Sequence, residues 1–104
     1  MRPELVIFDC DGVLVDTEPT SNAVLAENLT RHGLSLSAEE CTAMFTGWSM
    51  VNVEKEAKRL GAALPEGWIK DVYAEEFTAL KKGVPAMDGI HDILNRLDAI
   101  NLPF

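Results

Sequence analysis

Two aspartates separated by one residue lie near the start of the chain, at positions 9 and 11. The four residues before them, 5–8, are all apolar. Such a run is typical of a short strand buried on both faces of a parallel sheet, and it is too short for a buried helix. Open α/β sheets bind ligands at the carboxyl ends of their strands. The sequence therefore predicts that Asp9 and Asp11 lie at a ligand-binding edge.

The spacing of these aspartates suits phosphoryl chemistry. Alternation along the chain places Asp9 and Asp11 on related sides, and two close carboxylates need a cation between them to remain ionised. Mg²⁺ fits, because it takes one or two carboxylates and fills its other positions with water and phosphate oxygens. One carboxylate can attack phosphorus while the other moves a proton, and Gly12 permits a tight turn. Taken alone, aspartates after a strand are more often turn formers or helix caps.

The elements that must position these residues are mostly helical. Caps, breaks and apolar spacing predict helices over residues 20–32, 37–45, 50–60 and 65–82, with a capping box at Ser37 and Glu40. In the fourth helix, Trp68, Tyr73 and Phe77 are expected in the core. A further amphipathic helix, capped by Asp88, precedes what resembles the start of a second strand at 102–104.

Composition excludes several classes of function. The 104 residues include 9 basic and 17 acidic side chains, for a formal net charge of −8. No apolar run is long enough to span a membrane, and an acidic chain without a basic cluster is not expected to bind nucleic acid. Cys10 and Cys41 lack metal-ligand spacing and are expected to be reduced, structural thiols. The predicted location is cytoplasmic.

Residues 6–18 resemble the first signature of the haloacid dehalogenase-like (HAD) hydrolases, in the branch with β-phosphoglucomutase-like proteins and sugar-phosphate phosphatases. The helical insertion resembles the cap of that branch, and residues 84–97 resemble the return to the core. The resemblance implies an α/β fold, a Rossmann-like core with an inserted α-helical cap. Residues 1–16 would be core, 17–83 cap, and 84–104 the return helix and the start of the second strand.

The resemblance also implies roles for the matching positions. Asp9 would be the nucleophile that forms an aspartyl phosphate, and Asp11 the acid and base. Both would hold Mg²⁺, Asp11 through its backbone carbonyl. Gly12 and Val13 would present main-chain amides to the phosphoryl group. True dehalogenases of the superfamily lack an aspartate at the position of Asp11, so its presence favours phosphate esters.

Residues 46–49 fall where related proteins place a substrate-specificity loop in the cap. Gly47, Trp48 and Ser49 are therefore candidate substrate-binding residues. Gly47 permits close backbone approach, and Trp48 offers a flat apolar face with one indole donor. Packing of Trp48 in the cap core is an equally good interpretation.

Two departures from the family pattern favour hydrolysis to free phosphate. Hexose-phosphate mutases of the branch carry a histidine where this chain has Ser21, and an arginine where it has Met50. The predicted function is a Mg²⁺-dependent phosphatase of small phosphorylated metabolites. A phosphosugar mutase and a non-catalytic helical interaction module are the alternatives.

Three elements of the family's machinery are not found in these 104 residues: a phosphate-binding serine or threonine, a charge-balancing lysine and a distal acidic pair. The sequence is therefore expected to be the N-terminal part of a longer phosphatase, and to be inactive alone. Its expected partner is a missing C-terminal core segment or another chain that completes the sheet.

Overall fold

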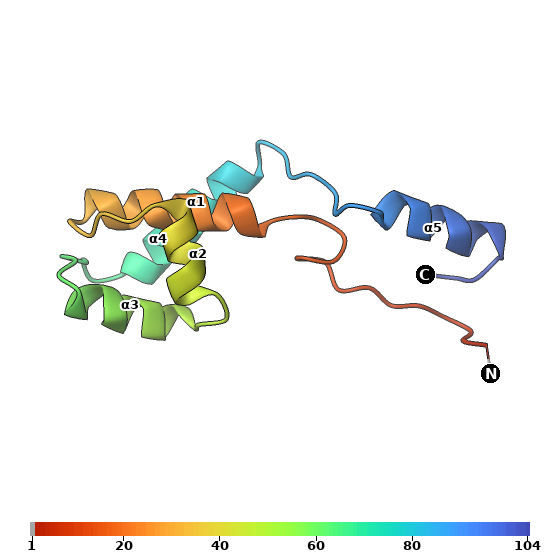
Figure 1. Cartoon of the computed structure of the whole chain (residues 1–104), viewed down its shortest axis with the longest axis horizontal. Helices are drawn as coiled ribbons and strands as arrows, with labels where there is room; N and C mark the ends of the chain where they lie inside the picture. The colour runs from red at the N-terminus through yellow and green to blue at the C-terminus, as the bar shows by residue number, and fades with distance from the viewer. Residues whose placement is uncertain (1) are drawn as a thin grey trace. The chain divides into compact units, whose positions relative to one another are not determined.

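The structure, a computed structural model, describes residues 2–104 and divides into two compact units. The first unit combines the residues up to Glu18 with Val84–Phe104, and the second is Pro19–Gly83. Helices α1 to α4 belong to the second unit, apart from the first residue of α1, and α5 belongs to the first (Figure 1). None of the helices in residues 2–104 is long and apolar enough to cross a membrane.

The first two helices follow local signals in the sequence. Helix α1 covers Glu18–Arg31 and α2 covers Ala38–Phe45. Gly33 takes a left-handed φ of 95° directly after the turn that ends α1, a conformation that glycine adopts without steric cost. The Ser37 side chain accepts from the Glu40 amide, and the Glu40 side chain accepts from the Ser37 amide, so the predicted capping box is confirmed.

Helices α3 and α4 complete the second unit. Helix α3 covers Met50–Arg59, and the Ser49 side chain caps it by accepting from the Asn52 amide at 3.3 Å. Helix α4 covers Trp68–Leu80 and begins after Gly67, which has a left-handed φ of 77°. The predicted start at residue 65 is therefore early, because residues 65–67 form a turn in which the Trp68 amide donates to the Pro65 carbonyl at 3.2 Å.

The core of the second unit forms around Trp68, which is fully buried. Its buried members are Leu25, Ala26, Leu29, Cys41, Phe45, Val53, Ala57, Ala62, Trp68 and Val72. The prediction that Tyr73 and Phe77 join this core is wrong, since they are 54% and 62% exposed. At 3.6 residues per turn, Tyr73 and Phe77 are rotated by about 140° and about 180° from Trp68 around the helix, which places them on its outer side.

A buried polar side chain joins α1 to α4. Asn28 is buried, and its Oδ1 accepts a hydrogen bond of 2.7 Å from the Trp68 indole Nε1. Its Nδ2 donates to Glu75 Oε2 at 2.5 Å, and Glu75 also forms an ion pair with Arg31. Both ends of the amide are satisfied, so its burial carries no unpaired polar group.

The strands predicted in the first unit do not form within the described residues. Residues 5–8 lie next to Pro103 with one backbone hydrogen bond, from the Val6 amide to the Pro103 carbonyl at 3.1 Å. Phe8 and Phe104 meet edge to face, with ring centroids 6.3 Å apart. A strand needs a ladder of such bonds to a neighbour, and residues 102–104 supply only this one. The α/β core therefore remains a prediction from the family resemblance.

Helix α5 covers Ile90–Ala99 and follows the predicted return segment. The prediction that Asp88 caps it is wrong, because Gly89, with a φ of 80°, occupies the N-cap position. Ile90 is buried, whereas Ile93 and Ile100 are about half exposed. The helix ends before Asn101, which has a left-handed φ of 55°, a conformation that asparagine tolerates better than most residues.

Replacing Asn28 by alanine should destabilise the second unit. The Asn28→Ala change leaves the buried Trp68 indole without an acceptor, which costs about 1–3 kcal/mol of unfolding free energy. Urea denaturation followed by far-UV circular dichroism measures this loss. Asn52→Ala, on the exposed surface of α3, is the matched control and should change stability by less than about 0.5 kcal/mol. Equal midpoints for the two variants would contradict the role assigned to Asn28.

Candidate functional site

The predicted nucleophile motif opens a tight hydrogen-bonded turn. The amides of Val13, Leu14 and Val15 all donate to the Cys10 carbonyl, at 3.3, 2.9 and 3.2 Å, and the Gly12 amide donates to the Val15 carbonyl at 2.9 Å. Gly12 has a φ of 74°, which L-residues with a side chain rarely adopt. Glycine at this position is therefore what allows the chain to turn immediately after Asp11.

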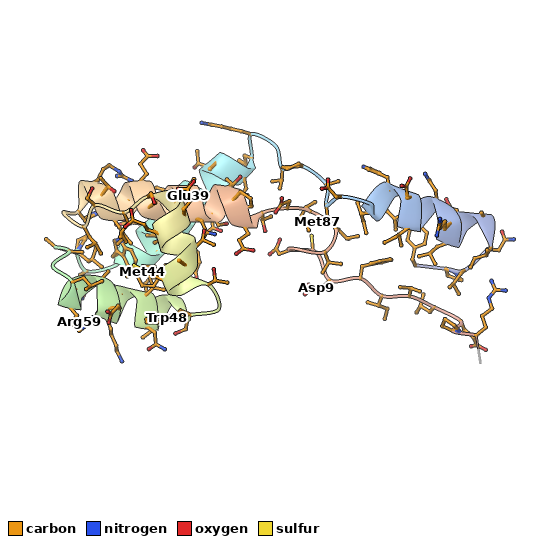
Figure 2. The ribbon with its side chains drawn as sticks, in the orientation of Figure 1. Asp9, Glu39, Met44, Trp48, Arg59 and Met87 are labelled. Carbon is orange, nitrogen blue, oxygen red and sulfur yellow. The ribbon has the colours of Figure 1, made fainter. Side chains whose placement is uncertain are left out.

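Asp9 and Asp11 are both exposed at the entry to this turn. The Cys10 amide donates to Asp9 Oδ1 at 2.8 Å, and Asp9 is labelled in Figure 2. Asp11 forms a backbone bridge with Val15. An ionised carboxylate has two oxygens with about four lone-pair sites in total. The single bond to Cys10 thus leaves Asp9 able to bind a cation or to attack an electrophile.

The amides of Gly12 and Val13 take part in the turn itself. The first donates to Val15 and the second to Cys10, as given above. The longer bond, 3.3 Å from the Val13 amide, is the weaker of the two by its length. An oxyanion would have to share or replace these bonds, so the predicted amide donors to a phosphoryl group stay a prediction.

The return segment, residues 85–87, forms backbone hydrogen bonds with the end of the turn, residues 14–16. The Asp16 amide donates to the Pro85 carbonyl at 2.8 Å, and the Met87 amide donates to the Leu14 carbonyl at 3.1 Å. Val15 bridges Ala86 in the antiparallel sense. The sequence predicts this segment only as a return to the core. Its apolar pattern gave no sign that its backbone would hold the nucleophile turn.

The residues at the turn suit a magnesium ion by their donor chemistry. Asp9 and Asp11 supply carboxylate and carbonyl oxygens, which hard divalent cations prefer. No group of three or more His, Cys, Asp or Glu side chains gathers as a metal site within residues 2–104. Mg²⁺ commonly takes only one or two protein carboxylates, with water and phosphate oxygens in its other positions. The pair therefore fits Mg²⁺ better than a cation that requires an all-protein cage.

The predicted specificity loop lies in the second unit, between α2 and α3. Gly47 has a φ of 83°, and Ser49 caps α3. Trp48 is 46% exposed, with its ring edge to face against Phe45 at 5.5 Å between centroids. The indole is thus held at one side and open at the other, whereas Trp68 is the tryptophan of the core. Asp9 and Asp11 belong to the first unit, whereas residues 47–49 belong to the second. The geometry of the two sets of predicted site residues is therefore described separately.

A groove of about 520 Å³ begins at this loop and follows α3. Gly47, Trp48, Ser49, Asn52, Lys55, Glu56 and Arg59 line it. Glu56 and Arg59 form an ion pair in which the Arg59 guanidinium lowers the pKa of Glu56, and the carboxylate raises the pKa of Arg59. Asn52, Lys55 and Arg59 are not among the ligand-binding residues that the sequence predicts. Their helical spacing of three to four residues was the available signal.

The family model for haloacid dehalogenase-like hydrolase matches residues 6–103 of the chain. The chain belongs to the haloacid dehalogenase-like hydrolases. The membership predicted from residues 6–18 is thereby confirmed. No curated protein matches the chain.

A crystal structure of similar fold supports the same family. It is a conserved haloacid dehalogenase-like protein of unknown function from Agrobacterium tumefaciens, with a TM-score of 0.80 and 32% sequence identity to this HAD-like chain. The match covers 90% of this chain and 43% of the other, so this chain spans less than half the length of that relative. The assignment of the two units as core and cap of a complete HAD-like hydrolase stays a prediction.

The two cysteines should differ sharply in reactivity. Cys10 is exposed at the turn, whereas Cys41 is buried in α2, where burial and the neighbouring Glu40 raise the pKa of its thiol. The thiolate is the reactive form, so iodoacetamide near pH 8 should modify Cys10 first. Cys41 should react only after denaturant is added. Peptide mass spectrometry over time measures this order, and Cys10→Ser should remove the early product. Early labelling of Cys41 would contradict the packing of α2.

Proposed function

We propose that this HAD-like chain carries the nucleophile and the cap of a Mg²⁺-dependent phosphatase for small phosphorylated metabolites. The observation that carries the proposal is the pair of exposed carboxylates, Asp9 and Asp11, at the entry to the hydrogen-bonded turn. Membership of a hydrolase family supports it, since the pair lies in residues 6–18, which resemble the first signature of that family. The phosphatase activity, the metal and the substrate class are the parts proposed.

The chemistry assigns separate roles to the two carboxylates. A carboxylate oxygen of Asp9 attacks the phosphorus of the ester, and the bond from phosphorus to the leaving oxygen breaks. Asp11 gives its proton to that leaving oxygen, which departs as an alcohol. Asp11 then takes a proton from water as the water attacks the aspartyl phosphate. Inorganic phosphate leaves, and the Asp9 carboxylate is restored.

A bound Mg²⁺ would supply positive charge that offsets the developing negative charge on the phosphoryl oxygens. The carboxylate of Asp9 and the backbone carbonyl of Asp11 would hold it. The hydrogen bond from the Cys10 amide restrains Asp9 Oδ1. The carboxylate therefore loses little conformational entropy when it attacks phosphorus.

Two positions in the second unit support hydrolysis over the phosphoryl transfer that a phosphosugar mutase carries out. The Ser21 hydroxyl donates to Glu76, which occupies it within the helical unit. Met50 packs, half-buried, against the core cluster of that unit. Neither side chain can act as the histidine or the phosphate-holding arginine that the mutases of the branch carry. The proposal therefore takes water as the acceptor of the phosphoryl group.

The remaining machinery is proposed to come from another segment or chain. The HAD-like relative of known structure is more than twice as long as the part that this chain matches. A serine or threonine for the phosphoryl oxygens, a lysine and a distal acidic pair would complete the charge balance at Asp9. The 104-residue chain alone is accordingly proposed to release no phosphate.

Substitution of the two aspartates tests the catalytic proposal. In the full-length protein that carries this sequence, phosphate release from a panel of phosphorylated metabolites should require Mg²⁺ and stop with EDTA. Asp11→Asn should lower kcat by about 10²–10⁴, the usual contribution of a general acid and base, and Asp9→Asn by at least as much. Asp16→Asn, beyond the turn, is the matched control. Full turnover by Asp9→Asn would overturn the assignment of the nucleophile.

Trapping distinguishes an enzyme from a non-catalytic helical module. Beryllium fluoride mimics a phosphoryl group on a carboxylate, so Mg²⁺-dependent binding to Asp9 is expected in the full-length protein. Fluorine NMR detects the bound species, which should be absent in Asp9→Asn. A protein that binds neither Mg²⁺ nor beryllium fluoride at this position would support the interaction module instead.

A further inference from the structure

The groove along α3 has the dimensions of a small-molecule site. Its volume of about 520 Å³ falls within the range of about 300–1,000 Å³ that is typical of ligand pockets. Figure 2 shows Trp48 at the loop that precedes α3 and Arg59 at the other end of that helix. The groove therefore runs from an aromatic ring toward charged side chains, entirely within the second unit.

The charges in the groove favour an anion. Arg59 binds Glu56 through both Nε and its terminal nitrogen, so this guanidinium and this carboxylate neutralise each other. Lys55 is exposed and forms no ion pair with another residue in the described part of the chain. The lining thus carries one net positive charge, on a protein whose formal net charge is −8. The ammonium of Lys55 is the group that an anionic ligand would find free.

The aromatic end of the groove favours a planar partner. The edge contact with Phe45 holds the Trp48 ring, yet nearly half of that residue is open to solvent. An exposed indole that is already held in place loses little conformational freedom when a flat ring stacks on it. The Ser49 hydroxyl and the Asn52 side-chain amide add polar groups to the lining of the groove.

We propose that this groove binds a small anionic molecule with a planar ring. The ring stacks on Trp48, and the anionic group pairs with Lys55. The same chemistry is found in the non-reacting part of a phosphate ester substrate and in a separate regulatory ligand. The proposed site lies within the second unit and depends on neither Asp9 nor a metal ion, so it stands or falls independently of the phosphatase proposal.

Binding by the 104-residue chain tests the site directly. The probe is adenosine 5′-monophosphate, with EDTA present and Asp9→Asn as the background, followed by ¹H–¹⁵N NMR. Saturable shifts are expected at Trp48, Ser49 and Lys55. Adenosine, which lacks the charge, should bind about two- to fivefold more weakly, and inorganic phosphate, which lacks the ring, about fivefold or more, because these are the contributions of an exposed ion pair and of a stacked ring.

Single substitutions locate the two contacts. Lys55→Gln should weaken binding of the probe about two- to fivefold, and Trp48→Leu about fivefold or more. Lys70→Gln, on α4 outside the groove, is the matched control and should bind like the parent. Trp48→Phe keeps an aromatic ring and should retain part of the affinity for the probe. It tests the stacking contact even where Trp48→Leu disturbs the fold.

Two results would overturn the proposal. One is the absence of saturable shifts in the groove up to about 10 mM probe, and the other is an affinity for the probe that both Lys55→Gln and Trp48→Phe leave unchanged. With binding established, the wild-type full-length protein distinguishes the two sources. Competition of the nucleotide with another phosphate ester, seen as a raised KM with kcat unchanged, identifies the groove as part of the substrate site. A changed kcat on that ester identifies a regulatory site.

Discussion

A hydrogen bond inside the second unit, from the Trp68 indole to Asn28, determines how α1 and α4 pack. The largest side chain of the core brings a donor into a region without water, and that donor must be satisfied there. Asn28 satisfies it from the facing helix, and Glu75 satisfies Asn28 in turn. The pair therefore fixes the register of the two helices as well as their contact, because a shift by one residue would leave both groups unpaired.

The first unit depends on a different constraint, the backbone of the turn after Asp9. Three amides converge on the Cys10 carbonyl, and Gly12 supplies the left-handed residue that this arrangement requires. The return segment then bonds to residues 14 and 16. Hydrogen bonds of the main chain, more than buried apolar area, hold the predicted nucleophile in place. Ile7, just before it, is largely exposed.

Local signals in the sequence predicted the helices well. Two of these signals are the capping box at Ser37 and Glu40 and the glycine after α1. Both depend only on residues a few positions apart, so the helix ends that they mark could be predicted without knowledge of the tertiary fold. The predicted strand at residues 5–8 depended on a distant partner, and its ladder did not form beyond Val6. Family membership was predictable because residues 6–18 carry a long specific motif.

Properties that depend on packing were less predictable. Apolar periodicity placed Tyr73 and Phe77 in the core, yet two apolar faces on α4 satisfy the same pattern and only one of them packs. Trp48 could have been a core residue or an exposed one, and only its exposed fraction of 46% in the folded chain distinguished these. The charges of the α3 groove had no motif, since surface lysines and arginines at helical spacing are common.

The bond between Asp16 and Pro85 has a consequence for how such proteins diversify. It joins the two chain ends from which the helical insertion departs, so the insertion is a closed loop on a fixed base. The entropy of closing a loop grows slowly, by about 0.6 kcal/mol for each doubling of its length. Lengthening, shortening or exchanging the insertion therefore costs the base little. Residues can therefore be added to or exchanged within this helical segment while the hydrogen bonds that close its two ends are kept.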